Sequence, residues 1–432
     1  MTDMQTPDGS PPDESAKTSW VMREPKERAE GEEANNPLGL VFLLGLLAMV
    51  WYFAGLASFV FVIGLIVMIF LHELGHFATA KWTGMKSTQF FLGFGPRIWS
   101  FRRGEVEYGL RMIPAGAFVR IIGMNNLDPV EDPADAPRAY SNKSYPRRML
   151  VITAGSLMHF IQAVLLFVVA SSVIGTEDPD SSWDIAAISG LETGEVPALD
   201  ANLAPGDTIV SADGVSTTNF DVLREVLQPK ANEPVTLVVR KADGQIEEAT
   251  VTLVELERSD GSVVGFLGIA PSFDGRIRES PMAGVRDFGG AMKAGLTAIP
   301  QFLSPSSFVN LGSLLFEGGE QVAITSDEAA ERPISMVGAV RIAGSEDVDW
   351  LGRVVILAFI NVFVGLVNLL PLLPLDGGHA AVATYERFRS FFTDRPYQAD
   401  VAKLLPITYG VVAILAFLFL STIWLDITRP IG

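Results

Sequence analysis

Two histidines and a glutamate carry the chemistry that this sequence offers. His72, Glu73 and His76 form a His-Glu-x-x-His pattern near the end of an apolar segment. Helical spacing of four residues places the two imidazoles one above the other on the same helix face. Such a pair can bind one Zn²⁺, and Glu73 beside it can serve as the general base toward a water molecule. The pattern therefore predicts a zinc site with an adjacent base.

The segment that carries the pattern is uncharged for most of its length. Residues 59–71 are almost unbroken apolar, which predicts that the histidines lie inside a membrane span. An ionisable side chain there costs about 2.5–3.5 kcal/mol to insert, so such residues usually mark function. The alternative is a chance pattern whose histidines make hydrogen bonds between helices.

Composition limits the class of protein. The chain has 432 residues, 49% of them hydrophobic, which is enough for a membrane core and a separate soluble domain. It has no cysteine, so disulfides and thiolate zinc sites are excluded. Its formal charge of -18 argues against a nucleic-acid partner. Lipid and membrane proteins are the expected partners.

Apolar segments predict four core membrane spans and one extra N-terminal span. Residues 37–80 exceed the roughly 20 residues that one span needs, so they are interpreted as two spans joined by a tight turn. One long tilted helix is the alternative. The predicted spans are 37–54, 57–80, 149–174, 353–379 and 405–427.

Charge predicts which side of the membrane each connecting segment occupies. Residues 1–36 are polar, acidic and Pro-rich, which predicts a disordered cytoplasmic tail. Residues 81–148 hold eleven Lys/Arg against six Asp/Glu and are expected inside. Residues 176–281 hold seven against twenty and are expected outside. Residues 282–350 predict an amphipathic linker, and the whole chain is expected in the inner (cytoplasmic) membrane.

The segment at 81–148 contains a Gly-rich apolar stretch. Two short strands are expected near 97–102 and 105–112, followed by extended backbone over 113–122. Extended backbone at membrane depth needs a protein or water partner, and an exposed edge strand can pair with an extended peptide. We therefore expect a membrane-associated β-hairpin with a substrate edge, or else a plain cytoplasmic hairpin.

The external segment predicts a β-rich domain at 183–256. Strands are expected at 208–211, 235–240 and 249–254, with a helix at 220–227. The Pro-Gly-Asp turn, strand and second turn between Leu203 and Gly214 resemble the signature of bacterial PDZ domains, which bind peptides by strand addition. A small β-rich spacer is the alternative.

Asp376 completes the predicted metal site. It lies in the proline-broken stretch 368–379 that follows a later apolar segment. With a rise of about 1.5 Å per residue, His72 lies ~13 Å and His76 ~7 Å from the boundary at Lys81, and Asp376 falls in the same layer. A carboxylate is a common third ligand in catalytic zinc sites, where water takes the fourth position. The alternative is that Asp376 only ends a helix.

The two His-containing motifs and the PDZ-like insert between them, in this order, resemble the site-2 protease family of intramembrane zinc metalloproteases. The likeness covers about residues 57–427 and is closest to bacterial members with a single PDZ domain, which act in regulated intramembrane proteolysis. It implies that His72, His76 and Asp376 bind zinc and that Glu73 is the base.

The same resemblance implies substrate-binding residues. Asn368 would hold the substrate or stabilise the oxyanion, and the Gly-rich stretch 115–122, with Gly116 and Phe118, would match the family's membrane-embedded hairpin. Many members carry an Asn where this chain has His159. This histidine is expected either to contact substrate or water, or to make a plain interhelical hydrogen bond.

The sequence thus predicts a polytopic α-helical membrane protein that acts as an intramembrane zinc endopeptidase. Its expected substrates are membrane-spanning proteins, such as anti-sigma factors, already trimmed by an upstream site-1 protease. The PDZ domain would act as the gate that selects them. The competing hypothesis is a non-catalytic, membrane-anchored PDZ adaptor with a structural metal site.

Overall fold

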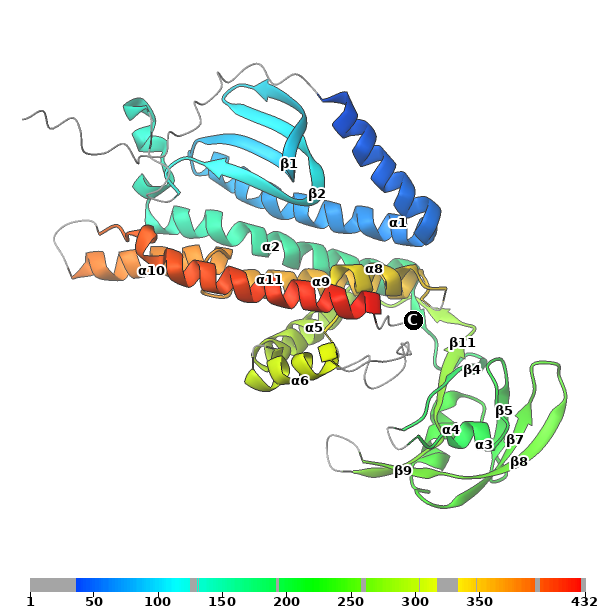
Figure 1. Ribbon diagram of the computed structural model, residues 1–432. Coiled ribbons are helices and arrows are strands. Elements are labelled where there is room, and N and C mark those ends of the chain that lie inside the picture. The colour runs from blue at the N-terminus through cyan, green and yellow to red at the C-terminus, as the bar shows by residue number, and fades with distance from the viewer. Residues whose placement is uncertain are drawn as a thin grey trace, which may run out of the picture.

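The computed structural model combines a helix bundle, a small sheet beside it and a separate β domain at one end (Figure 1). The predicted disordered tail lies outside the described residues except for its last residue, Asn36. The described residues are 36–124, 130, 132–191, 194–257, 262–302, 304–316, 333–346, 348–392 and 397–428.

Helix α1, Pro37–Trp82, consists of two arms. Gly55 interrupts it with φ 78° and ψ 175°, a conformation that glycine adopts without steric cost. Figure 1 shows the arms folding back from this point in a V. The break favours the predicted pair of segments over one long tilted helix. That the first arm crosses a membrane remains a prediction.

Four helical segments of the described chain are long and apolar enough to cross a membrane, as expected for a polytopic membrane protein. They are Pro37–Trp82, Tyr145–Ile174, Trp350–Asn368 and Val401–Thr428. Many of their large apolar side chains are exposed, including Leu420 and Trp424 in the last segment. Exposed apolar surface on such helices suits contact with lipid.

The stretch predicted as one span over 353–379 is two helices. Helix α9, Trp350–Asn368, ends before Pro371 and Pro374, and helix α10, Asp376–Phe391, begins after them. Proline lacks the amide hydrogen that a continuing helix needs, so the helix stops. The expected cytoplasmic loop after Asp376 is therefore helical through Phe391.

Strands β1, Ser87–Arg103, and β2, Val106–Ile121, are longer than the short strands predicted. Both bend and pair twice: Phe90 lies opposite Val119 and Tyr108, and Tyr108 also lies opposite Phe101. The lateral order is thus 97–103, 106–111, 87–92 and 117–121. The predicted extended Gly-rich segment forms one outer edge, and the sheet packs against α1 (Figure 1).

The β domain matches several of the predicted elements. Helix α4, Phe220–Leu227, has the expected bounds and is capped by Asn219. The expected strand at 249–254 is instead the end of β8 and the start of β9. The four-stranded sheet of the β domain has the order β6-β5-β7-β8. The elements are β4 Trp183–Ile188, α3 Pro197–Asp200, β5 Thr208–Ala212, β6 Val215–Ser216, β7 Pro234–Arg240, β8 Ile246–Thr252, β9 Val254–Glu257, β10 Val263–Phe266 and β11 Ile269–Phe273.

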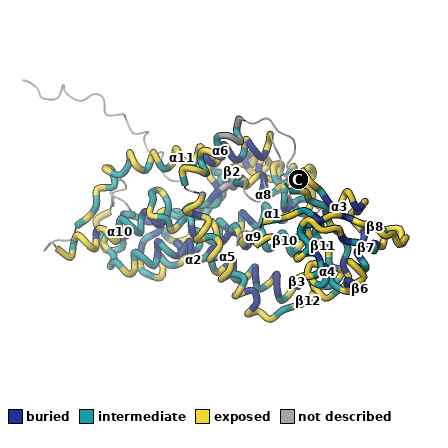
Figure 2. The backbone as a smooth tube through the Cα atoms, turned by 90° about the horizontal axis from the view of Figure 1, so that it is seen from below, coloured by how far each residue is buried: buried dark blue, intermediate teal, exposed yellow. Residues whose placement is uncertain are grey.

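Leu223, Leu237 and Leu253 are among the buried side chains in the interior of this domain. Figure 2 shows buried segments of its backbone in dark blue. The short strands β3, Thr176–Glu177, and β12, Arg276–Ile277, pair with each other where the chain enters and leaves the domain. The identity of the domain as a PDZ domain remains a prediction.

The remaining helices cover and connect the bundle. Helix α2, Tyr145–Val169, continues as one wider turn to Ile174. The predicted amphipathic linker contains α5, α6 and α8, and α5 packs against α2 and α9. The bounds of these and the other helical pieces are α5 Pro281–Phe302, α6 Pro305–Phe316, α8 Met336–Gly344, α11 Leu405–Thr428 and 3₁₀ turns at Pro133–Arg138, Tyr140–Asn142 and Val401–Leu404.

Candidate metal centre

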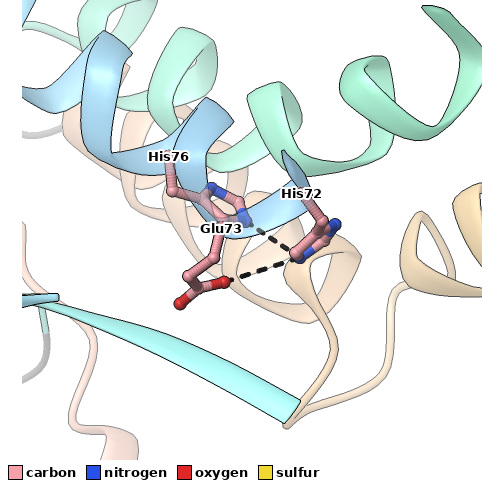
Figure 3. Close-up of side chains that lie close together, drawn as sticks. All are labelled: His72, Glu73 and His76. Atoms are coloured by element: carbon pink, nitrogen blue, oxygen red, sulfur yellow. Dashed lines mark hydrogen bonds and ion pairs between the residues drawn. The ribbon is translucent and has the colours of Figure 1, made fainter. Parts of the chain in front are cut away.

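The second arm of α1 presents His72, Glu73 and His76 together (Figure 3). The Nε2 atoms of the two histidines lie 3.2 Å apart, as their helical spacing predicts. Glu73 Oε2 lies 3.8 Å from His72 Nε2. These three residues form a cluster whose ligand atoms all lie within 4.8 Å of one another.

His76 is oriented by the main chain of α2. Its Nδ1 lies 2.7 Å from the Val151 carbonyl oxygen, which can only accept a hydrogen bond. Nδ1 therefore carries the proton, and Nε2 is left with its lone pair toward His72. Sequence reasoning missed Val151 because a main-chain carbonyl leaves no signal in residue type.

Asp376 joins the histidines from α10, a different part of the chain. Its Oδ2 atom lies 3.3 Å from His76 Nε2 and 3.6 Å from His72 Nε2. It is the first residue of α10, and Gly377 and Gly378 follow it. A Cβ at either glycine would lie within 2.4 Å of main-chain atoms of residues 369–373, so only glycine allows this close turn.

The geometry of these three residues fits a zinc ion. Zinc bonds of about 2.0–2.1 Å in a tetrahedral site separate the ligand atoms by roughly 3.3–3.4 Å. The observed separations of 3.2, 3.3 and 3.6 Å agree with that value. Asp376 Oδ2 is also buried with no hydrogen-bond donor among the described residues. A buried carboxylate oxygen without a hydrogen-bond donor is expected where a metal ion would be its partner.

Glu73 is linked to the outer strand of the small sheet. The amide of Val119 donates to Glu73 Oε1 at 2.5 Å. The edge segment 117–121 therefore runs beside the expected base. As with Val151, the contact is through the main chain, so residue type gave no indication of it.

Helix α2 passes the histidines at a glycine. A Cβ on Gly155 would lie 2.3 Å from His76 Nε2 and 2.4 Å from His72 Cε1. The space for the imidazoles thus depends on the missing side chain. In this part of α2 the sequence pointed to His159 and gave no sign that Gly155 belongs to the site.

His159 lies against the site and also bonds to another helix. Its ring centroid is 4.8 Å from that of His72. Its Nδ1 lies 3.1 Å from Asn361 Oδ1 in α9, which is the interhelical hydrogen bond that the sequence left open. Asn361 was missed, although an amide inside an apolar span is a detectable signal. A contact of His159 with substrate remains a prediction.

The other predicted substrate-binding residues are Asn368, Gly116 and Phe118. Asn368 is the half-buried last residue of α9. Gly116 packs under the ring of Phe94, and Phe118 stacks on Phe91 at 5.6 Å. Gly116 and Phe118 therefore shape the sheet whose edge reaches Glu73.

Comparisons with known proteins cover nearly all of these residues. A model of peptidase family M50 matches residues 60–416. Zinc metalloprotease Rip1 of Mycolicibacterium smegmatis is 32% identical over 426 aligned residues, covering 88% of this chain and 98% of that protein.

Two further relatives give the same result. Zinc metalloprotease Rip1 of Mycobacterium tuberculosis is 32% identical over 410 residues, covering 86% of this chain and 97% of that protein. Putative zinc metalloprotease all3971 of Nostoc is 28% identical over 331 residues, covering 75% and 85%. The matched family segment includes both α1 histidines and Asp376.

Proposed function

The chain belongs to peptidase family M50 and is a zinc metalloprotease, and we propose that it cuts peptide bonds within or near the transmembrane segments of membrane proteins. The observation that carries this proposal is the meeting of Asp376 with His72 and His76 beside Glu73. These four side chains lie in or next to segments apolar enough to span a membrane.

In this proposal His72, His76 and Asp376 hold the metal. Zn²⁺, when bound, polarises a peptide carbonyl and activates a water molecule. Glu73 accepts a proton on its carboxylate and delivers it to the amine of the leaving segment. His76 keeps its Nδ1 proton on the Val151 carbonyl throughout, which holds Nε2 toward the metal.

The edge segment 117–121 would hold the substrate in extended form. A transmembrane helix hides its peptide bonds, so it must unwind locally before it can be cut, and its freed backbone groups then need partners. Pairing with an edge strand supplies these partners. The contact between Val119 and Glu73 supports this role because it sets the edge beside the base. Asn368 and His159 are the proposed polar contacts to substrate.

The β domain would select substrates. We assign it to the outside of the inner membrane because residues 176–281 are strongly acidic, and the metal site to the cytoplasmic side, next to the basic segment 81–148. A PDZ domain so placed would admit substrates that an upstream protease has already trimmed, as expected for anti-sigma factors.

The competing function is a membrane-anchored adaptor with a structural metal. Structural zinc sites usually have four protein ligands and no base. Here three ligand atoms form a triangle with zinc-like spacing, and Glu73 lies beside it. This arrangement favours the enzyme.

Reconstituted Glu73→Gln protein tests the proposal. We expect it to bind zinc as the wild type does and to lose cleavage of a membrane-spanning substrate, because the ligands remain and the base is gone. Glu105→Gln, in an exposed ion pair outside the site, is the matched control. Turnover by Glu73→Gln within tenfold of wild type would refute the mechanism, and full loss in Glu105→Gln would make the assay unspecific.

A further inference from the structure

Helix α10 carries Asp376, and the direction of the preceding helix α9 does not fix the position of α10. Helix α9 ends at Asn368, and seven non-helical residues separate it from Asp376. Two of these residues are prolines, so helical hydrogen bonds do not transmit the direction of α9 to α10. The place of Asp376 therefore depends on what holds α10 to the rest of the bundle.

A buried ion pair joins α10 to α2. Arg148 Nη2 donates to Glu386 Oε2 at 2.5 Å, and the two side chains are only 14% and 10% exposed. The guanidinium also lies 4.7 Å over the ring of Tyr140. The second oxygen of Glu386 accepts the amide of Ala399 at 2.8 Å, in the segment that leads to α11. One carboxylate thus connects α10 to two other parts of the chain.

The contact between helices α2 and α10, here called the seam, also includes the metal site, and the ion pair lies at one end of it. Arg148 lies three residues before Val151, whose carbonyl orients His76. Glu386 lies ten residues after Asp376, about 15 Å along α10. Tyr145 and Thr384 bridge the same two helices through their hydroxyls at 3.1 Å.

The apolar side chains that α10 contributes to this contact are small. Ala383 of α10 packs in a buried cluster with Ala80, Val151 and Ile152, and Ala380 lies at its margin. Alanine side chains form only shallow ridges, so they do little to stop one helix from sliding along another. A buried ion pair has one favourable geometry, and such pairs can fix a register even where they add little net stability.

We infer that Arg148 and Glu386 form a latch that positions Asp376 against His72 and His76. The latch acts through the register of α10 on α2, so both are positioning residues and neither touches the metal. The inference rests on the proposed role of Asp376 as a metal ligand. It identifies the residues that position Asp376, the proposed third ligand.

The test measures zinc affinity and backbone protection in the full-length protein. Glu386→Gln and Arg148→Gln should each weaken zinc binding, measured by competition with a chelator, by about tenfold, the low end of the effect of changing a direct hydrogen-bond partner of a ligand. The visible spectrum of the Co²⁺-substituted protein should shift in both. The double variant, Arg148→Gln with Glu386→Gln, should bind zinc no more than about twofold more weakly than the weaker single variant, because both changes break the same contact.

Glu105→Gln is the matched control, because Glu105 accepts hydrogen bonds of 2.6 and 2.8 Å from Arg138 and neither residue belongs to α2 or α10. It should bind zinc as the wild type does. Wild-type affinity in both single latch variants would overturn the inference. So would losses of affinity in the two single variants that simply add in the double variant.

A measurement without metal separates this inference from the proposed function. Hydrogen exchange of α10 amides in the metal-free protein should increase in Glu386→Gln and not in Glu105→Gln. Unchanged exchange would overturn the latch whatever the metal does. Failure of the wild type to bind zinc would instead refute the proposed function. If Glu386→Gln fails to fold, Thr384→Val breaks the milder hydroxyl contact of the same seam, and it should give the same changes at smaller size.

Discussion

Val119 donates its amide to the carboxylate of Glu73, although the two residues are 46 positions apart in the chain. The bond joins the helix that carries the proposed zinc ligands His72 and His76 to the edge of the small sheet. A substrate strand that pairs with this edge would therefore arrive beside the base. In the proposed mechanism, substrate binding and proton transfer would thus be linked at the Val119 peptide group.

Removing that amide should slow cleavage without releasing zinc. Val119→Pro lacks the donor, and an outward-facing edge position tolerates proline. Loss of one hydrogen bond to a charged group is worth about 1.5–3 kcal/mol, so we expect turnover to fall roughly 10- to 100-fold. Val119→Ala keeps the amide and serves as the control. Equal turnover in the two variants would show that the bond has no catalytic role.

Gly155→Ala should lose zinc. The added methyl group would lie 2.3 Å from His76 Nε2, so the imidazoles must move. Overpacking of this kind costs about 1–3 kcal/mol, and here it would displace the proposed zinc ligands themselves. Gly289→Ala in α5 is the control, because a Cβ there meets nothing within 4 Å. Metal content measured after purification decides the outcome, and equal content in both variants contradicts the expected crowding.

Asp376→Ala should lose both metal and cleavage. The variant removes the oxygen that lies 3.3 Å from His76 and 3.6 Å from His72. His379→Gln, three residues further along α10, should retain zinc. If Asp376→Ala keeps full zinc occupancy and His379→Gln does not, His379 is the third ligand instead.

Stability of the β domain should fall in acid through Asp207. Burial opposes its ionisation, but hydrogen bonds from Lys241 and from the amides of Ala204 and Ala242 prevail and hold the pKa of Asp207 below its ordinary value of 3.8. The folded domain then binds fewer protons than the unfolded chain, so this stabilisation is full above about pH 4 and is lost as pH falls through the lowered pKa.

Asp207→Asn should cost about 2 kcal/mol near neutral pH and should flatten the acid dependence of unfolding. Fluorescence of Trp183, which is buried in the same domain, can follow the transition in the full-length protein against a Trp183→Phe blank. An acid dependence as steep in Asp207→Asn as in wild type would exclude this residue as the cause.

Removing the β domain should relax substrate selection. The deletion should remove the residues between Asp178 and Gly275. The Asp178 amide donates to the Gly275 carbonyl at 3.0 Å, so these two ends already meet and the β3–β12 pair can stay intact. A deletion limited to 183–256 would leave β11 without its partner β4. The shortened enzyme should bind zinc and cleave an untrimmed membrane substrate. If it binds zinc but still refuses that substrate, the domain is not the gate.

The sequence by itself determined the local parts of this protein. The spacing of His72 and His76 fixes their proximity because a helix repeats every 3.6 residues. The break at Gly55, the end of α9 before two prolines and the bounds of α4 also follow from short-range rules for glycine, proline and capping residues. These features depend on neighbours in the chain, which one sequence displays.

The meeting of Asp376 with the histidines was predicted from the sequence, but only the tertiary structure decided which other distant groups join them. Val151 and Val119 act through main-chain atoms, which are the same in every residue type and so cannot be identified from sequence. Gly155 matters because another helix brings imidazoles to it. The length of β1 and β2 follows from pairing each strand twice, which no local pattern encodes. Contacts of this kind depend on the packing of whole elements, and packing is set by the sum of many weak interactions rather than by any single motif.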